Sequence, residues 1–350
     1  MVKPVTFASV ALLLLTLLLP HLGTVSSLSV SAQPTLLYSF VHLTDTQTLS
    51  ERFPKTLNST FLYLEQVKSE YNIRRIIVTG DLVQHWNRVT EWHNFVSATT
   101  LTSIETDCLA GNHDNASGRN FTYYNHYIGA DRQFYFKVFD DFLFLYASWP
   151  NQANTLNQTI LAYFNSILDS YPSKIPIFAT HYYSDGHSTG HHHHHHHHHH
   201  YHHLSALGQQ LLSLTRTPAL VLMGHVLGAW IYIRNVRDKP VYEFNTNYQN
   251  ANRSYVRIFS VYSDATIYVK EIRVEPKPLA TASTFMFSYS LTAEPYVQVT
   301  FVNTEMRNNA QTTTQKVDLT YAIVGIVATP LIIGLVAGKG LLKHSQSRIL

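Results

Sequence analysis

Residues 106–114 read TDCLAGNHD, a strand-length segment that ends in a glycine, an amide, an imidazole and a carboxylate. Four other short apolar runs of strand length also end in a polar donor. They are Leu36–Leu43 before Asp45, Arg74–Val78 before Asp81, Ile175–Ala179 before His181, and Ala219–Met223 before His225. Oxygen and imidazole donors brought to one rim are what a divalent metal site requires. The five strand ends therefore predict a metal centre.

The segments between these strands have the pattern of amphipathic helices. Residues 56–71 place apolar side chains at helical spacing, and residues 86–98 and 159–171 have similar patterns. Alternation of strands and helices predicts an α/β sandwich whose ligands gather at the strand ends.

The remaining segments predict antiparallel strands. Residues 133–148 predict a β-hairpin that turns at Asp140 and Asp141. Residues 231–274 alternate Tyr, Val, Ile and Phe with short turns, which favours a run of antiparallel strands, and residues 285–302 favour one more hairpin.

The motifs at the strand ends resemble those of the calcineurin-like metallophosphoesterase superfamily. The family pattern runs D-x-H, GD, GNH[DE], a lone H and G-H-x-H, and here it reads DTQ at 45–47, GD at 80–81, GNHD at 111–114, His181, and GHVL at 224–227. The resemblance covers residues 36–275. It implies a four-layer α/β/β/α sandwich that hydrolyses phosphate mono- or diesters of small molecules or nucleotides. It also implies two divalent ions (Mn, Zn, Fe or Co) that activate a water.

The resemblance also assigns roles to single residues. The implied metal ligands are Asp45, Gln47, Asp81, Asn112, His181 and His225. Asp81 would bridge the two ions. His113 matches the histidine that stabilises the phosphoryl group or protonates the leaving oxygen, with Asp114 nearby to orient it. Imidazole suits that proton transfer because it titrates near neutral pH.

Two positions depart from the family pattern, and both belong to the first metal. Gln47 stands where the pattern has histidine, and a carboxamide oxygen coordinates more weakly than imidazole. Leu227 stands where the pattern has the last histidine, and leucine coordinates nothing. Either the first site binds its ion loosely, or another group completes it.

Residues 187–204 read HSTGHHHHHHHHHHYHHL. Three interpretations stay open: a solvated low-complexity loop, a segment that gathers metal, and a donor that fills the position opposite Leu227. His187, His191 and His202 are the candidate auxiliary ligands. We expect replacement of residues 191–203 by Gly and Ser to lower metal uptake while sparing most activity.

Both ends of the sequence carry targeting patterns. Residues 1–32 have the form of a secretory signal peptide. Residues 319–338 contain no charge and have the length of a membrane helix, and Lys339, Lys343 and Arg348 follow them. These patterns predict a single-pass cell-membrane protein whose body is outside and whose short basic tail is cytoplasmic.

The predicted organisation follows from these patterns. It comprises a signal peptide at 1–32, a phosphoesterase domain at 33–275 with the His-rich loop at 187–203, a small β extension at 276–302, a polar stalk at 303–317, a transmembrane helix at 318–338 and a tail at 339–350.

Charge argues against a nucleic-acid surface. Without the four bases of the leader and tail, 21 of the 25 Lys and Arg residues remain against 22 acids, so we expect no basic groove. Cys108 is the single cysteine, which excludes an internal disulfide. The alternative to an enzyme is a catalytically weakened homologue that serves as a surface metal-binding protein, and Leu227 favours it.

Overall fold

The computed structural model describes residues 34–185, 203–251, 253–274, 279–289 and 297–300. All of them belong to one compact unit. Within these residues, no helix is long and apolar enough to cross a membrane. The expected signal peptide, stalk, transmembrane helix and tail lie outside the described residues.

The elements follow in the chain order β1, α2, α3, β2, α4, β3, α5, a 3₁₀ helix, β4, β5, α6, β6, α7 and β7–β13. The helices are α2 (Gln47–Arg52), α3 (Pro54–Val67), α4 (Val89–Thr99), α5 (Thr122–Tyr127), the 3₁₀ helix Ala130–Arg132, α6 (Gln158–Ser170) and α7 (Ala206–Leu212). The strands are β1 (Leu36–Leu43), β2 (Ile73–Thr79), β3 (Glu105–Leu109), β4 (Phe134–Phe139), β5 (Phe142–Ala147), β6 (Ile175–Thr180), β7 (Leu220–Met223), β8 (Gly228–Val236), β9 (Lys239–Asn247), β10 (Ser254–Tyr262), β11 (Thr266–Val274), β12 (Leu279–Tyr289) and β13 (Val297–Thr300).

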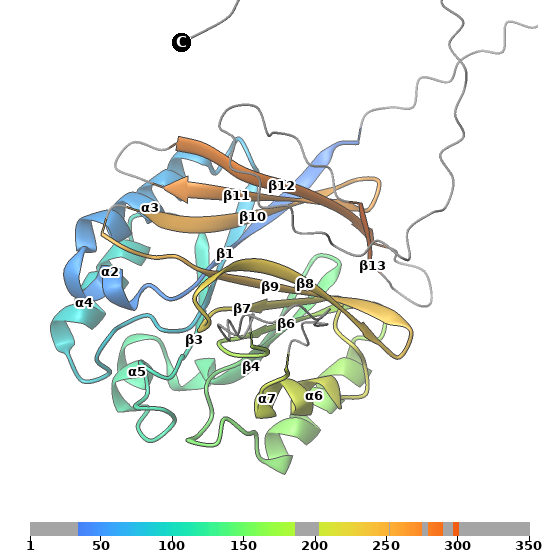
Figure 1. Cartoon of the computed structure of the whole chain (residues 1–350), viewed down its shortest axis with the longest axis horizontal. Helices are drawn as coiled ribbons and strands as arrows, with labels where there is room; N and C mark the ends of the chain where they lie inside the picture. Colours follow the sequence, from blue (N-terminus) through green and yellow to red (C-terminus); the bar gives the residue numbers. More distant parts are fainter. Residues whose placement is uncertain (1–33, 186–202, 252, 275–278, 290–296, 301–350) are drawn as a thin grey trace, which may run out of the picture. The chain divides into compact units, whose positions relative to one another are not determined.

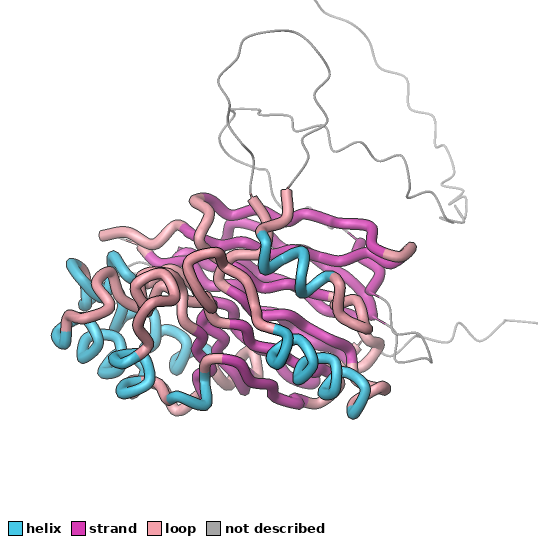
Figure 2. The backbone as a smooth tube through the Cα atoms, turned by 90° about the horizontal axis from the view of Figure 1, so that it is seen from below, coloured by secondary structure: helices cyan, strands magenta, loops and turns pink. Residues whose placement is uncertain are grey.

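The strands form two sheets with helices on their outer faces (Figures 1 and 2). One sheet has the order β13-β12-β11-β10-β1-β2-β3, and the other has the order β4-β5-β6-β7-β9-β8. Strands β1, β2 and β3 run parallel, as do β5, β6, β7 and β9. The carboxyl ends of each parallel set therefore lie at one edge of its sheet.

Aromatic side chains fill the space between the two sheets. Phe40 of β1 stacks on Phe259 of β10 at 4.8 Å between ring centroids and meets Phe144 of β5, in the other sheet, edge-on at 5.3 Å. Full burial of such a ring contributes about 1.5–3 kcal/mol. Because this contact joins the sheets, it fixes how their ligand-bearing edges face each other.

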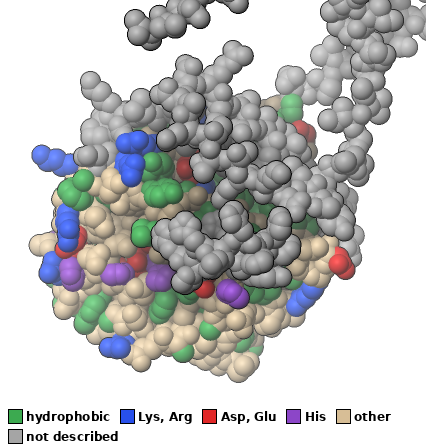
Figure 3. Space-filling model, in the orientation of Figure 1, with side chains coloured by type: hydrophobic (Ala, Val, Ile, Leu, Met, Phe, Trp, Pro, Cys, Tyr) green, Lys and Arg blue, Asp and Glu red, His purple; other side chains and the backbone are tan. Residues whose placement is uncertain are grey.

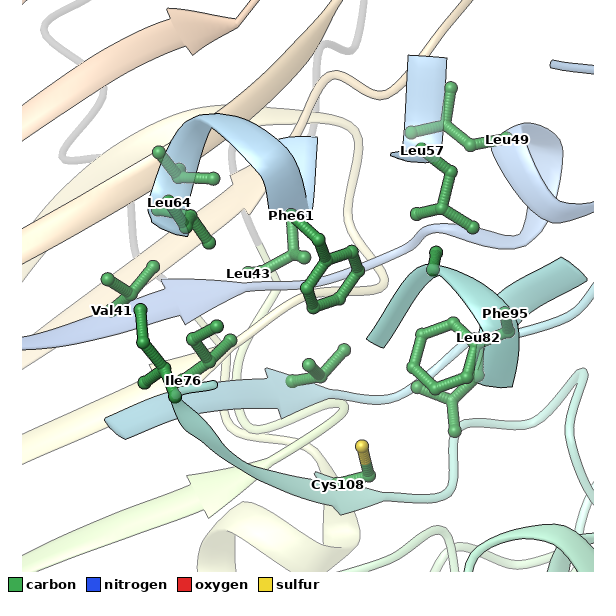
Figure 4. Close-up of a cluster of buried hydrophobic side chains, with 14 of the residues drawn as sticks. Val41, Leu43, Leu49, Leu57, Phe61, Leu64, Ile76, Leu82, Phe95 and Cys108 are labelled. Atoms are coloured by element: carbon green, nitrogen blue, oxygen red, sulfur yellow. The ribbon is translucent and has the colours of Figure 1, made fainter. Parts of the chain in front are cut away.

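The outer faces are covered by the amphipathic helices. Leu57, Phe61 and Leu64 of α3 are buried in one cluster with Val41 and Ile76 of the first sheet (Figure 4). On the other sheet, Phe164 of α6 and Leu207 of α7 are buried in one cluster with strand residues. The sandwich of helices and sheets predicted from the sequence is thereby confirmed.

Some local expectations were wrong. The run 231–274 does not form one antiparallel set: β8 and β9 join the second sheet, where β9 pairs in parallel with β7, and β10 and β11 join the first. Helix α4 begins at Val89 rather than Trp86, because the Glu91 side chain holds the backbone amide of His85 in a loop. The hairpin turning at Asp140 and Asp141 is present as β4 and β5.

The His-rich segment leaves and re-enters the fold at a closed neck. Ser184 and Leu204 form an antiparallel bridge, and the amide of Asp185 donates to the His203 carbonyl at 2.8 Å. The Ser184 hydroxyl donates to buried Glu243 at 2.6 Å. The two ends of the segment are therefore held together by described residues on both sides.

Candidate metal centre

Five strand ends bring the predicted ligands together, as the parallel strands require. Asp45 follows β1, Asp81 follows β2, and Asn112 follows β3 in the first sheet, while His181 follows β6 and His225 follows β7 in the second. Contacts cross between the sheets: Asp81 Oδ2 lies 3.3 Å from His181 Nε2, and the amide of His225 donates to Asp45 Oδ2 at 3.0 Å.

The backbone at three of these residues is strained. Asp45, Asp81 and His225 have φ values of 55°, 52° and 68°, in the left-handed region that L-residues rarely occupy. Such conformations cost about 1–3 kcal/mol each and cluster at functional sites. The strain turns each side chain inward at the point where its strand stops.

Two glycines make room for the carboxylates. A Cβ on Gly111 would overlap Asp81 Oδ1, and a Cβ on Gly224 would overlap Asp45 Oδ2. The glycines of GNHD and of the GH motif thus let the backbone pass close beside the two acids.

Two histidine rings and Asp81 converge on one point. His181 donates from Nδ1 to the Thr79 carbonyl at 2.8 Å, so in the neutral ring Nε2 carries the lone pair. That Nε2 lies 3.3 Å from His225 Nδ1 and 3.3 Å from Asp81 Oδ2. Acceptor atoms this close need a positive charge between them. A hydrogen bond from the other ring nitrogen, such as the one to Thr79, fixes the tautomer of a metal-binding histidine.

Charges in this pocket respond strongly to each other. Burial disfavours a charged His181, but the Asp81 carboxylate prevails and raises the pKa of His181 to about 9. Burial and the neighbouring His181 lower the pKa of His225 to about 4. The pocket therefore favours one positive charge, which a divalent cation can supply in place of the proton.

Asn112 adds an oxygen to this group. Its Oδ1 is buried and has no hydrogen-bond partner within the described residues, and a buried carbonyl without a partner costs about 1–3 kcal/mol. The ligand atoms of Asp81, His181 and His225 lie within 4.8 Å of one another. These four residues fit a divalent cation with mixed oxygen and nitrogen ligands.

The other predicted ligands are arranged differently. Asp45 is buried, and burial raises its pKa to about 7. Gln47, the first residue of α2, turns its Nε2 toward Asp81 Oδ2 at 3.3 Å and leaves its own Oε1 buried without a partner in the described chain. The side chain of Leu227 is 84% exposed and takes no part in the centre.

His113 and Asp114 separate into two roles. The imidazole of His113 donates from Nδ1 to the Gln84 carbonyl at 2.9 Å, and its Nε2 lies 4.0 Å from Asp81 Oδ2. Asp114 was expected to orient His113, but it accepts the backbone amides of Leu82, Val83 and Gly111 at 2.7–3.0 Å. The group that orients His113 is therefore Gln84, and Asp114 joins the two ligand loops.

Aromatic rings enclose the second-sheet side of the centre. Trp149 lies 5.3 Å from the His225 ring and stacks on Tyr182 at 6.0 Å, and Tyr182 in turn lies 4.7 Å from His225. These rings hold His225 from behind. Trp149 and Tyr182 were not predicted, because nothing in the sequence marks a lone Trp or Tyr as a neighbour of a metal ligand.

Asn245 and Asn247 were also missed. Asn247 donates from Nδ2 to Asp45 Oδ1 at 2.9 Å and to the His225 carbonyl at 3.2 Å. Asn245 donates to the carbonyls of Val226 and Gly228 at 2.8 and 2.7 Å. The available signal was the spacing of two Asn residues at i and i+2 near the end of a strand, which places both on one face.

The candidate auxiliary ligands His187, His191 and His202 lie outside the described residues. A separate group joins half-buried Glu51 and His85 to buried Glu91. Arg88 Nη1 lies 3.4 Å from Glu91 and 3.8 Å from Glu51, so this group is already an ion-pair network. Figure 3 shows histidine side chains in purple in a band across the visible face, with acidic side chains between them.

A family model for calcineurin-like phosphoesterases matches residues 38–229. The chain belongs to this family. It is 25% identical over 171 residues to the uncharacterized protein YvnB of Bacillus subtilis, which covers 42% of this chain and 13% of that relative. The chain thus spans a small part of the curated relative that it matches.

One solved phosphatase shares the fold at low identity. Purple acid phosphatase PPD1 from yellow lupin (Lupinus luteus) seeds superposes with a TM-score of 0.51 and 12% identity, over 72% of this chain and 53% of that one. GAP50, described as the anchor in the inner membrane complex of Plasmodium, gives a TM-score of 0.39 and 15% identity. The match covers 78% of this chain and 90% of that one. The mixed α/β fold with two sheets flanked by helices is that of metallophosphoesterases.

Proposed function

We propose that the chain hydrolyses phosphate mono- or diesters of small molecules or nucleotides with a divalent metal, outside the cell. The observation that carries this proposal is the convergence of Asp81 Oδ2, His181 Nε2 and His225 Nδ1 beside the unpartnered Asn112 Oδ1. Mn, Zn, Fe and Co all accept such a mixed set of ligands. A divalent cation bound there lowers the pKa of a coordinated water and polarises a phosphoryl oxygen.

His113 is the residue placed to move a proton. Its Nδ1 hydrogen is committed to the Gln84 carbonyl, so exchange takes place at Nε2. The side chain is 34% exposed, which lets a substrate reach it. A protonated Nε2 donates to the leaving oxygen, a step worth about 10²–10⁴ in rate.

Anchoring in the cell membrane is the second part of the proposal. The uncharged stretch 319–338 and the bases that follow it support a single span with a cytoplasmic tail. The leader pattern at 1–32 supports an external catalytic domain.

Turnover by the full-length chain tests this function. Phosphatase activity is measured on p-nitrophenyl phosphate and on bis(p-nitrophenyl) phosphate with Mn, Co or Zn. We expect hydrolysis of at least one, loss of it in Asp81→Asn, and retention in the control Asp131→Asn, whose side chain is 84% exposed. Verified metal content without turnover on either ester would reject the enzyme.

A second candidate is a catalytically weakened surface metal-binding protein. The exposure of Leu227 favours it, because no donor stands at that position of the motif. Metal binding without turnover in the same assay identifies this function.

A further inference from the structure

We propose that the centre of this chain holds one divalent cation rather than the pair implied by its family, and that Asp45 positions the His225 loop instead of binding metal. The inference rests on the proposed metal-dependent function. It concerns the number of bound ions and the role of Asp45, and both can be measured independently of catalytic activity.

Both oxygens of the Asp45 carboxylate already accept hydrogen bonds from the protein. A carboxylate offers about four lone-pair sites. Oδ2 of Asp45 accepts from Thr44 Oγ1 at 2.7 Å and from the His225 amide at 3.0 Å. Oδ1 accepts from Asn247 Nδ2 at 2.9 Å and shares the His225 amide at 3.2 Å. Three donors, Thr44 Oγ1, Asn247 Nδ2 and the shared His225 N–H, therefore already engage both oxygens.

The role of Asn247 in this network is fixed by its surroundings. Its amide nitrogen faces two acceptors, Asp45 Oδ1 and the His225 carbonyl, so the nitrogen and not the oxygen must point there. An N–H aimed at Asp45 opposes a cation at the same position. Asn247 therefore stabilises the Asp45 carboxylate by a hydrogen bond.

Asp81 shows the opposite pattern. Its Oδ1 accepts the His113 amide at 3.0 Å, but its Oδ2 faces His181 Nε2, which is an acceptor in the neutral ring because Nδ1 carries the hydrogen. His225 Nδ1 lies 3.3 Å from that Nε2, so three ligand atoms converge where a cation would bind. Asn112, on the loop whose His113 amide binds Asp81, offers the buried and unpartnered Oδ1 as a fourth ligand. One carboxylate is thus prepared for metal and the other for hydrogen bonds.

The other groups that would bind a second ion, at positions 47 and 227, form an incomplete set of ligands. Gln47 presents Nε2, a donor, to Asp81. Leu227 offers no donor atom, and its side chain is held outward because Asn245 binds the carbonyls of Val226 and Gly228 on either side of it. Of the four groups that the family pattern gives the first ion, Asp45 is engaged by hydrogen bonds and Leu227 has no donor atom. Only the shared Asp81 and the unpartnered Oε1 of Gln47 remain, which is an incomplete set for a second ion.

Asp45 then has a structural task at the centre. The Asp45 carboxylate accepts a hydrogen bond from the His225 backbone amide. Asn247 donates a hydrogen bond to the His225 backbone carbonyl. The two residues hold His225 at its φ of 68°. Asp45 is therefore a positioning residue for a ligand that comes from the other sheet.

Manganese binding tests the inference. The full chain carries Gly and Ser in place of residues 191–203 in every sample, so that the centre alone is counted. It is loaded with Mn(II) and dialysed, bound metal is counted by mass spectrometry, and the ion is examined by electron paramagnetic resonance. We expect one ion per chain with the spectrum of an isolated Mn(II), since a second ion bridged by Asp81 would give an exchange-coupled pair.

Variants sharpen the test in both directions. Asp45→Asn should keep one ion, whereas in a two-ion centre it would remove one. Gln47→His/Leu227→His restores two imidazoles and should raise the count toward two, with a coupled spectrum. Asp131→Asn, on the surface, is the matched control for Asp45→Asn.

The outcomes separate the two proposals. Two coupled ions in the unsubstituted centre, or loss of an ion in Asp45→Asn, overturn the single-ion inference and leave the phosphoesterase standing. Failure to bind any Mn(II), with no turnover, overturns the proposed function and this inference together. One uncoupled ion with turnover supports both.

Discussion

The imidazole of His113 donates from Nδ1 to the backbone carbonyl of Gln84 at 2.9 Å, which leaves Nε2 facing the centre. We therefore expect His113→Ala to lower kcat by about 10²–10⁴ while metal content stays unchanged. Steady-state kinetics and metal analysis check this. The exposed His126 on α5 provides the control, since His126→Ala should leave kcat as it was. A parallel loss of metal in His113→Ala would contradict a role in proton transfer alone.

Gly111 sets the position of Asp81. A methyl group in Gly111→Ala would overlap Asp81 Oδ1 and the Asp81 backbone nitrogen, and the backbone nitrogen cannot swing away. Displacement of a reacting group by about 1 Å costs about 10²-fold in rate. We expect a loss of that size in kcat and weaker Mn(II) binding, measured by calorimetry. Metal affinity equal to that of the natural chain would show that the carboxylate lies elsewhere.

Asp114 should matter for stability more than for proton transfer. In Asp114→Asn an N–H₂ group must face one of the three amides of Leu82, Val83 and Gly111, so a donor meets a donor. The expected cost is about 1–3 kcal/mol in the free energy of unfolding, measured with urea. The shape of the kcat pH profile should not change. A shifted acidic limb would restore Asp114 as the partner of His113.

His42 makes folding sensitive to acid. The ring is fully buried on β1, and burial, assisted by Arg257, lowers its pKa to about 3 from an unfolded value of 6.5. Between these values the unfolded chain binds the extra proton, so the contribution to stability is complete above pH 6.5 and is lost as pH falls toward 3. The slope should be about 1.4 kcal/mol per pH unit.

Comparison with His42→Gln isolates this slope from those of other groups. Urea unfolding of both proteins at pH values between about 6 and 4 gives the difference directly. We expect the variant to be less stable near neutral pH but to lose less stability on acidification. Equal slopes would mean that His42 titrates normally in the folded chain.

Much of the centre could be predicted from the sequence because its information is local. Each of Asp45, Asp81 and His181 follows a buried strand at once, and parallel strands must end at a common edge. The same local logic predicted β1 at its observed bounds and the β4–β5 turn at Asp140. These features depend on neighbours in the chain.

The remaining features depend on contacts between distant residues. Asn247 reaches Asp45 across 202 positions, and Gln84 reaches His113 across 29. Strand β9 pairs in parallel with β7, although its alternating pattern fits parallel and antiparallel pairing equally well. Alternation reports burial on one face, and pairing partners follow from the packing of the whole sandwich.

The closed neck formed by Ser184 and Leu204 has a consequence for how this gene can change. A repetitive codon tract is prone to gain or lose codons during replication. Each histidine gained or lost here would lie between Ser184 and Leu204, the two residues of the bridge. Lengthening a loop whose ends are already joined costs little, because closure entropy grows slowly with length. His181 lies only three residues before the bridge, so related chains can be expected to vary in the number of histidines while the geometry of the centre is inherited intact.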